Sequence, residues 1–433
     1  MLGRAFKRLW NGKRGNALLI MAGAFPLLLG SAGLATDTIQ WTLTKRQLQR
    51  AADSAAIAGV YASIQREQNT SAQTVTDAIA KHLYVDKAVS LKLKNAEIVL
   101  SLAEEVDENP TSPYLNAVKV KLSSQKSLSF SSIFMGTVPT ITAQATAATI
   151  ETGVYCVVSL ENTDETGITA TGSGDINLGC GMITNSISLD AAIATGAVNI
   201  DADPVAAVGG IGGDQWGTGT TLLPFTLAQA DPFQDIYPPV PSGTCPSLTV
   251  GSNVTTHIAN TTGTACFGGM SLNGTVTMDP GVYLIDAGDF SIGSGANVTC
   301  NGCVFILTSR TADTNPSSVG SVTMNGGPQL NLTAPTSGTF ANILFYQDRR
   351  ARSLQGANPI SNKINGSATS ILSGVFYFPR QALDLNGTAE LTVNCGQFVA
   401  RTVTFSGNGG IANSCAAGYG GSSIKGLHVR LVA

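Results

Sequence analysis

Charged and aromatic residues are scarce in this 433-residue chain, at 12% and 6% of the total. Disordered chains combine low hydrophobicity with high net charge, whereas here 43% of the residues are hydrophobic and the net charge is −3. The composition therefore excludes a wholly disordered protein. Glycine is abundant, with 48 residues, and glycine between short apolar runs is typical of many short strands separated by tight turns.

Residue patterns that carry catalysis are also missing. The three histidines, His82, His257 and His428, lie in different segments, and the sequence contains no HExxH, GxSxG or Walker A motif. Residues 407–412 match a dinucleotide-binding pattern, but no helix is expected after them, so we interpret them as a turn. The sequence predicts no enzyme activity, no cofactor and no metal site.

Two clusters of charged side chains keep glycan chemistry open as a weaker hypothesis. Paired carboxylates cleave glycosides when they lie about 5–10 Å apart, although solvated turns explain the acidic cluster equally well. A solvated loop is likewise the favoured interpretation of the basic cluster. The acidic cluster consists of Asp279, Asp286 and Asp289, and the basic cluster of Arg349, Arg350 and Arg352.

The two parts of the chain carry opposite net charge. Residues 1–149 contain 16 Lys and Arg against 10 Asp and Glu, whereas residues 150–433 contain 9 against 18. Binding to a nucleic-acid backbone requires a basic surface. The acidic second part therefore argues against nucleic acid as a partner.

Cysteine is absent from the first 155 residues, and all eight cysteines follow. An even number confined to one region indicates disulfides in an oxidising compartment, with buried free thiols as the alternative. A zinc or redox role for the CxxC motif at 300–303 would need further ligands or a βαβ context, which the sequence does not supply. Spacing does not fix the connectivity, and our hypothesis is local pairing: Cys156 with Cys180, Cys245 with Cys266, Cys300 with Cys303, and Cys395 with Cys415.

One segment, residues 17–35, is long enough to cross a membrane. Its 19 residues carry no charge, and about 20 apolar residues span the ~30 Å hydrocarbon core as a helix. The segment follows five basic residues and no acidic one, so the positive-inside rule places residues 1–16 in the cytoplasm and the remainder in the periplasm. We therefore expect a single-pass inner-membrane protein. A cleaved signal peptide is the alternative, but the apolar run exceeds the usual core of about 7–15 residues.

The helical pattern continues past the membrane segment to about Arg66 and carries a stripe of small residues. Small side chains let helix backbones approach closely. We consider two roles for this small-residue stripe, a seam for a partner helix or packing against the protein's own first sheet. The stripe consists of Leu48, Ala51, Ala52, Ala55, Ala58, Gly59 and Ala62.

Residues 36–150 are predicted to form a small α+β domain with a single sheet. Its strands are expected where apolar and polar residues alternate. The expected elements are a second helix over 74–84, strands over 96–102, 117–122 and 139–150, and a short amphipathic helix over 130–135.

Two motifs carry a family resemblance. Residues 33–37 read Gly-Leu-Ala-Thr-Asp, and residues 47–59 read Gln-Leu-Gln-Arg-Ala-Ala-Asp-Ser-Ala-Ala-Ile-Ala-Gly. Together with the basic tail and the apolar helix, they resemble the N-terminus of TadE/TadG-like proteins of Tad (Flp) pilus assembly. The resemblance covers about 150 residues and includes the strands up to residue 148. It implies a structural component of the pilus system whose partners are other Tad pilus-assembly proteins, either pilin-like or platform components.

The chain departs from that family pattern at two points. Prepilin-like relatives carry a glutamate five residues after the cleaved glycine, but the residue five after Gly15 is Ile20. Processing by a prepilin peptidase is therefore not expected. The Asp-x-Ser-x-Ser string of a von Willebrand A metal site is also absent from the sequence, so metal-dependent adhesion of that type is not expected.

Residues 151–433 contain a loose repeat. Apolar strands recur as GVYLI, CVFIL, NILFY, GVFYF and GQFVA, and their starts lie 22 to 39 residues apart. A unit of about 20–25 residues with inserted loops is what one coil of a parallel β-helix requires. We predict a right-handed parallel β-helix, with an antiparallel sandwich as the alternative. The Pro-rich segment 223–247 is interpreted as an extended crossover between two blocks of coils.

Three functions remain from the sequence. The favoured one is a membrane-anchored assembly component of a Tad-type pilus with the β domain in the periplasm. The second is a β-helical module or adhesin that binds polysaccharide or peptidoglycan, with cell-wall glycan as partner. The third and weakest is a polysaccharide lyase or hydrolase, which would require converging acidic or arginine side chains in a groove.

Overall fold

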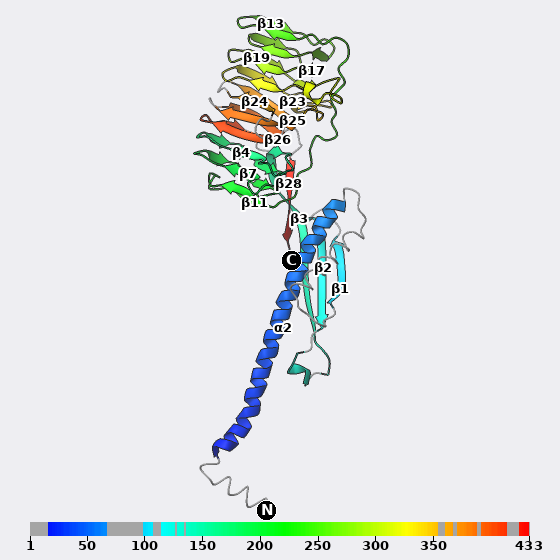
Figure 1. Cartoon of the computed structure of the whole chain (residues 1–433), viewed down its shortest axis with the longest axis vertical. Coiled ribbons are helices and arrows are strands. Elements are labelled where there is room, and N and C mark those ends of the chain that lie inside the picture. Colours follow the sequence, from blue (N-terminus) through cyan, green and yellow to red (C-terminus); the bar gives the residue numbers. More distant parts are fainter. Residues whose placement is uncertain are drawn as a thin grey trace, which may run out of the picture. The chain divides into compact units, whose positions relative to one another are not determined.

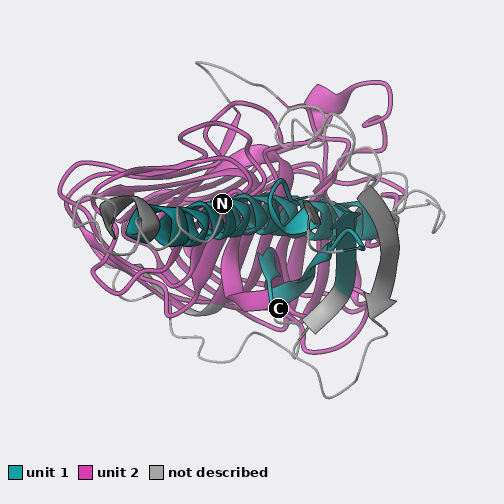
Figure 2. Cartoon of the chain, turned by 90° about the horizontal axis from the view of Figure 1, so that it is seen from below, with its two compact units in different colours: residues 1–150, 429–433 teal, residues 151–428 magenta. Residues whose placement is uncertain are grey.

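The computed structural model divides into two compact units, which we describe separately (Figures 1 and 2). Unit 1 comprises residues 1–150 and 429–433, and unit 2 comprises residues 151–428. The helix expected over 74–84 lies outside the described residues. The structure describes residues 16–66, 98–106, 114–125, 128–133, 136–353, 360–366, 370–387, 391–413 and 424–432.

Unit 1 combines one long helix with an antiparallel sheet. The helix α2 (Asn16–Arg66) runs for 51 residues and continues through Pro26. The sheet has the order β1 (Ile98–Val106), β2 (Tyr114–Gln125), β3 (Thr140–Ser159), with antiparallel pairs throughout. The three strands agree with the expected ones to within a few residues at their starts, although β3 extends well beyond residue 150. The short helix expected over 130–135 is a 3-10 turn, η1 (Ser131–Ile133).

Alternation along β2 and β3 explains why α2 packs on this sheet. Successive residues of a strand point to opposite faces, and the apolar ones of β2 and β3 are buried on one face. The helix α2 contacts β2, and the small-residue stripe in its second half is mostly buried. The buried strand residues include Val118, Val120, Leu122, Ile141, Ala143 and Ala145.

Unit 2 is mostly β and its strands form two blocks. Block A follows the second half of β3 and ends at residue 224. It contains β4 (Ile168–Ala170), β5 (Asp175–Asn177), β6 (Gly181–Thr184), β7 (Ala192–Ala194), β8 (Asn199–Asp201), β9 (Val205–Ala207), β10 (Ile211–Gly213) and β11 (Leu222–Pro224).

Block B begins at residue 248 and is followed by the C-terminal strand β28 (Ile424–Leu431). A short 3-10 turn, η2 (Pro316–Ser318), interrupts it. Block B contains β12 (Leu248–Val250), β13 (Thr255–Ile258), β14 (Thr264–Phe267), β15 (Met270–Leu272), β16 (Thr275–Met278), β17 (Gly281–Asp286), β18 (Phe290–Ile292), β19 (Asn297–Asn301), β20 (Cys303–Thr308), β21 (Val322–Met324), β22 (Gln329–Thr333), β23 (Ile343–Gln347), β24 (Ser361–Asn365), β25 (Ile371–Gly387), β26 (Leu391–Gly407) and β27 (Ile411–Asn413).

The strand pairs described for unit 2 are all parallel, and most join a strand to the third one further along the chain. In block B, for example, β12 pairs with β15 and β15 with β18, while β13 pairs with β16 and β16 with β19. Block A repeats this pattern, with β4 paired to β7 and β7 to β10. Three strands therefore form one layer, and layers stack on one another. The antiparallel sandwich considered from the sequence is wrong for this unit.

The two blocks join into one stack at a junction between the two ends of unit 2. Strand β26 lies parallel to β3 and β4, with Phe398 opposite Val157 and Val403 opposite Ile168. In Figure 1 the stack runs from β13 through β25 and β26 to β4, β7 and β11. The last layers of block B thus lie on the first layer of block A, and segment 225–247 connects the far ends of the two blocks.

Arg349 and two tyrosines hold this connecting segment against block B. The Arg349 guanidinium donates to the Asp231 carboxylate at 3.2 Å and to the main-chain oxygens of Phe233 and Ile236. The Tyr377 hydroxyl donates to the same carboxylate at 2.7 Å, and the Tyr346 hydroxyl donates to the Ile236 oxygen at 2.6 Å. Burial raises the pKa of Tyr346 to about 12, so this hydroxyl stays a donor at neutral pH.

The few aromatic side chains of the protein are concentrated in the core of block B. Five fully buried phenylalanine rings form a continuous row through the core, with neighbouring centroids 4.7–5.5 Å apart. Aromatic pairs at this spacing contribute about 0.5–1.5 kcal/mol each beyond the burial of their area. The rings belong to Phe290, Phe305, Phe345, Phe376 and Phe398.

Arg401 lies at the junction of the two blocks and is almost fully buried there. Its guanidinium lies 2.5 Å from the Glu161 carboxylate, which is 2% exposed, and 2.7 Å from that of Glu165. The main-chain oxygen of Arg401 accepts the Ser159 hydroxyl at 2.8 Å. A residue of β26 is thereby joined by charge and by hydrogen bonds to the start of block A.

We predict that Arg401→Met destabilises unit 2 by about 3–5 kcal/mol, because it leaves a buried carboxylate without its partner. The matched control is Lys425→Gln. It removes an ion pair with Glu151 in which both side chains are roughly half exposed, and we expect a change below about 1 kcal/mol. Denaturant unfolding of the two variants checks this prediction, and equal destabilisation by both would contradict it.

Candidate functional site

The first part of α2 presents an apolar surface on every side. Seven large side chains between residues 20 and 34 are 53–76% exposed, and each would gain about 1.5–3 kcal/mol by leaving water. Within the described part of the chain, α2 is the one helix long and apolar enough to cross a membrane. It therefore fits a membrane anchor. The exposed side chains are Ile20, Met21, Phe25, Leu27, Leu28, Leu29 and Leu34.

This apolar surface continues beyond residue 35. Ile39, Trp41 and Leu43 are exposed by 59%, 44% and 52%, and the first basic residues after them are Lys45 and Arg46. Tryptophan is enriched at the boundary between membrane and water. The apolar side chains thus continue along the helix beyond residue 35, where the membrane segment expected from the sequence ends.

Asp37 is the one acidic residue of this apolar stretch, and it is buried rather than solvated, at 2% exposure. Its carboxylate accepts the backbone N–H groups of Phe130 and Ser131, at 3.0 Å and 2.5 Å. These hydrogen bonds hold the loop between β2 and β3 against α2.

Gly33 lies one helical turn before Asp37 and contacts the same loop. A Cβ atom at this position would collide with the Phe130 ring, so only glycine lets the ring lie against the helix. Residues four apart share a helix face. Gly33 and Asp37 of the Gly-Leu-Ala-Thr-Asp motif thus form one site, which we call the loop clamp. The motif was visible in the sequence, but its contact with residues 130–131 was not.

The small-residue stripe is buried inside unit 1. Six of its seven members are buried, and Ala58 is partly exposed. Gln49, beside the stripe, donates to the Gln144 oxygen of β3 at 2.8 Å. This burial is consistent with packing on the protein's own sheet, and a seam for a partner helix at the same residues stays a prediction.

Another face of α2 borders an open hollow of about 490 Å³. Arg50, Asp53, Ser54, Ile57, Ala58 and Tyr61 line it. These positions recur every three or four residues and therefore share one side of the helix.

Three cysteine pairs lie at bonding distance, Cys156–Cys180, Cys245–Cys266 and Cys300–Cys303. These are three of the four pairs expected from the sequence. The side chains of Cys395 and Cys415 lie outside the described residues, so their pairing stays a prediction.

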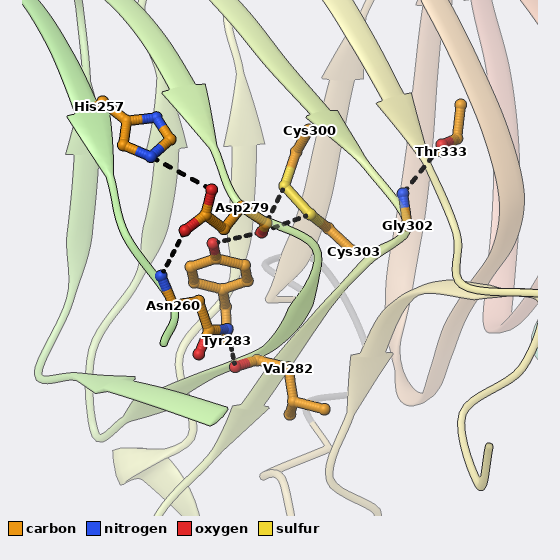
Figure 3. The surroundings of a disulfide bond; sticks show 9 residues. All are labelled: His257, Asn260, Asp279, Val282, Tyr283, Cys300, Gly302, Cys303 and Thr333. Carbon is orange, nitrogen blue, oxygen red and sulfur yellow. Dashed lines mark hydrogen bonds and ion pairs between the residues drawn. A yellow bond between two sulfur atoms is a disulfide. The ribbon is translucent and has the colours of Figure 1, made fainter. Parts of the chain in front are cut away.

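The corner formed by Cys300 and Cys303 is a packing feature of block B (Figure 3). Both cysteines are fully buried, and the main-chain oxygen of Asp279 faces both sulfurs and accepts the Tyr283 hydroxyl at 2.6 Å. The Asp279 carboxylate lies 3.2 Å from His257. Burial raises the pKa of Tyr283 to about 12. A redox role, which needs an accessible thiolate, does not fit this environment.

The three carboxylates of the acidic cluster have different partners. Asp279 pairs with His257, Asp286 lies 2.5 Å from Arg310, and Asp289 accepts the Ser321 N–H at 2.8 Å. Each carboxylate thus has its own partner. Among the described residues, no group of three or more His, Cys, Asp or Glu side chains is arranged to hold a metal ion.

The comparison with known families bears on α2. Residues 15–63 match the TadE/G-like Flp pilus-assembly family. The matched segment contains the apolar part of α2, the loop-clamp residues Gly33 and Asp37, and the small-residue stripe. No curated protein and no solved structure matches the chain. The match thus covers α2 alone among the described elements.

We predict that Asp37→Ala releases the loop between β2 and β3, because the two backbone N–H groups lose their acceptor. Amide hydrogen exchange of residues 128–133 in the full chain should accelerate, while the amides of β2 stay protected. Thr38→Ala is the matched control, because the Thr38 hydroxyl bonds only the Leu34 oxygen of its own helix. Unchanged exchange in Asp37→Ala, or equal acceleration in the control, would show that the clamp does not hold the loop.

Proposed function

We propose that this protein is a membrane-anchored structural component of a Tad-type pilus-assembly system. The observation that carries the proposal is the TadE/G-like match over residues 15–63, which coincides with the apolar part of α2 and the loop clamp. In this proposal α2 is both anchor and assembly element. Its first half lies in lipid, and its second half fixes the sheet of unit 1.

The proposed topology is a single pass through the bacterial inner membrane, with residues 1–16 in the cytoplasm and both units in the periplasm. The basic tail before α2 supports this orientation. The three cysteine pairs support an oxidising compartment for unit 2. An uncleaved anchor is favoured over a signal peptide because the 19-residue apolar run exceeds the usual signal core of about 7–15 residues. Processing by a prepilin peptidase is not expected because Ile20 stands where prepilin-like relatives carry glutamate.

We further infer that the stack of unit 2 is a right-handed parallel β-helix. The three-strand period of its parallel pairing supports this architecture, as do the stacked inward-facing phenylalanines. In such a fold one coil cannot bury its own core, so neighbouring coils stabilise one another. A stiff periplasmic body of this kind suits a scaffold role beside pilin-like or platform components.

Deletion of the encoding gene in the native bacterium tests the function. We expect loss of surface pili, counted by electron microscopy, and restoration by the full chain supplied in trans. A chain whose residues 1–35 are replaced by a cleavable signal peptide should reach the periplasm without restoring pili, because it lacks the anchor. Normal piliation after deletion would overturn the proposal, and restoration by the anchorless chain would overturn the role of the anchor.

A further inference from the structure

Most basic side chains after residue 150 already have an acidic partner. Of the nine, five form ion pairs: Arg310, Arg349, Arg350, Arg401 and Lys425. The other four, Arg352, Lys363, Arg380 and Arg430, form no ion pair with the described residues. Arg352 makes one 3.4 Å side-chain hydrogen bond, to the Ser317 hydroxyl.

Arg352 and Arg380 line the same cavity, although they are separated by 28 positions in the sequence. This cavity of about 400 Å³ lies beside block B and also contains Ser353. A second cavity of about 400 Å³ shares Ser353 and Arg380 and is also lined by Glu161, Asn162 and Arg401 at the junction of the blocks. Because the two cavities share two lining residues, we call them together the junction groove.

The charge of the first cavity is unusual for this part of the chain. Unit 2 has an excess of acidic residues, yet four arginines and one aspartate line this cavity. The aspartate, Asp313, is bound 2.8 Å from Arg350, which also pairs with Asp348. Residues 354–359, which follow Ser353, contain no acid in the sequence. Arg352 and Arg380 thus bring two uncompensated positive charges to one cavity.

Arginine pairs of this kind suit planar oxyanions. A guanidinium presents donors in a fork that matches a carboxylate, and charged hydrogen bonds of this type are stronger than neutral ones. The polar side chains of Asn162 and Ser353 offer partners for sugar hydroxyls along the groove. No aromatic side chain is among the described residues that line it, so recognition would rest on charge and hydrogen bonds rather than on stacking.

We propose that the junction groove binds the carboxylate groups of an acidic polysaccharide through Arg352 and Arg380. The choice of a polysaccharide as the ligand rests on the proposed periplasmic location of unit 2. The choice of a carboxylate rests on the two arginines alone and does not depend on that location. Of the basic cluster seen in the sequence, Arg349 and Arg350 serve the fold, and Arg352 is the member left for a ligand. Arg380 was not recognised from the sequence because it lies on strand β25, 28 positions after Arg352.

The test uses the full-length protein in nanodiscs and measures its affinity for polygalacturonate at low salt, with dextran as the neutral comparison. We expect binding to polygalacturonate alone, weakened by added salt. The double variant Arg352→Gln/Arg380→Gln should lose about tenfold or more in affinity. Lys363→Gln/Arg430→Gln is the matched control, because it removes the same charge outside the groove and should bind as the wild type does.

Two outcomes would overturn the proposal. An equal loss of affinity in both double variants would mean that binding depends only on the net charge of the protein. Displacement of the polymer by inorganic phosphate at matched charge concentration would identify a small-anion site instead. The unfolding midpoints of both double variants are measured as well. If they equal that of the wild type, a loss of affinity comes from the groove and not from unfolding. Binding of polygalacturonate by the purified protein does not require pili. The binding experiment and the piliation experiment can therefore fail independently of each other.

Discussion

The parallel pairing of β26 with β3 and β4 is the interaction on which unit 2 depends. It joins residues about 240 positions apart, and the buried Arg401–Glu161 pair lies within it. Stacked layers stabilise one another through the interfaces that they share with their neighbours. The junction provides such an interface for both blocks at once. The chain must therefore complete its last layers before its first layer is covered.

This closure also positions the other features of unit 2. Because block B returns to the start of block A, a connecting segment must run between the far ends of the blocks, and Arg349 with Tyr346 and Tyr377 fixes it in place. The same return brings Arg380 and Arg401 into one cavity with Asn162 of block A. The junction groove is thus a consequence of the closure, in the same way that the loop clamp in unit 1 is a consequence of the hairpin between β2 and β3.

Local patterns were sufficient to predict much of the structure. Apolar alternation located β2 and β3, and the uncharged run located the exposed half of α2. Contacts between distant residues could not be predicted. Asp37 meets residue 130 only because a hairpin returns along α2, and no spacing rule encodes that return. The junction is hidden for the same reason, since a repeating strand pattern predicts stacking on the next layer and not on a layer more than 200 residues away.

In the proposed function, α2 joins this protein to a pilus-assembly complex. A photo-crosslinking amino acid at Tyr61, which is 37% exposed on the helix, tests this role in intact cells of the native bacterium. The same substitution at Val254 in unit 2 is the control. We expect adducts between the Tyr61 position and pilin-like or platform proteins, identified by mass spectrometry, and none of them from Val254. Adducts from the Tyr61 position that contain no pilus component would show that α2 does not make this contact.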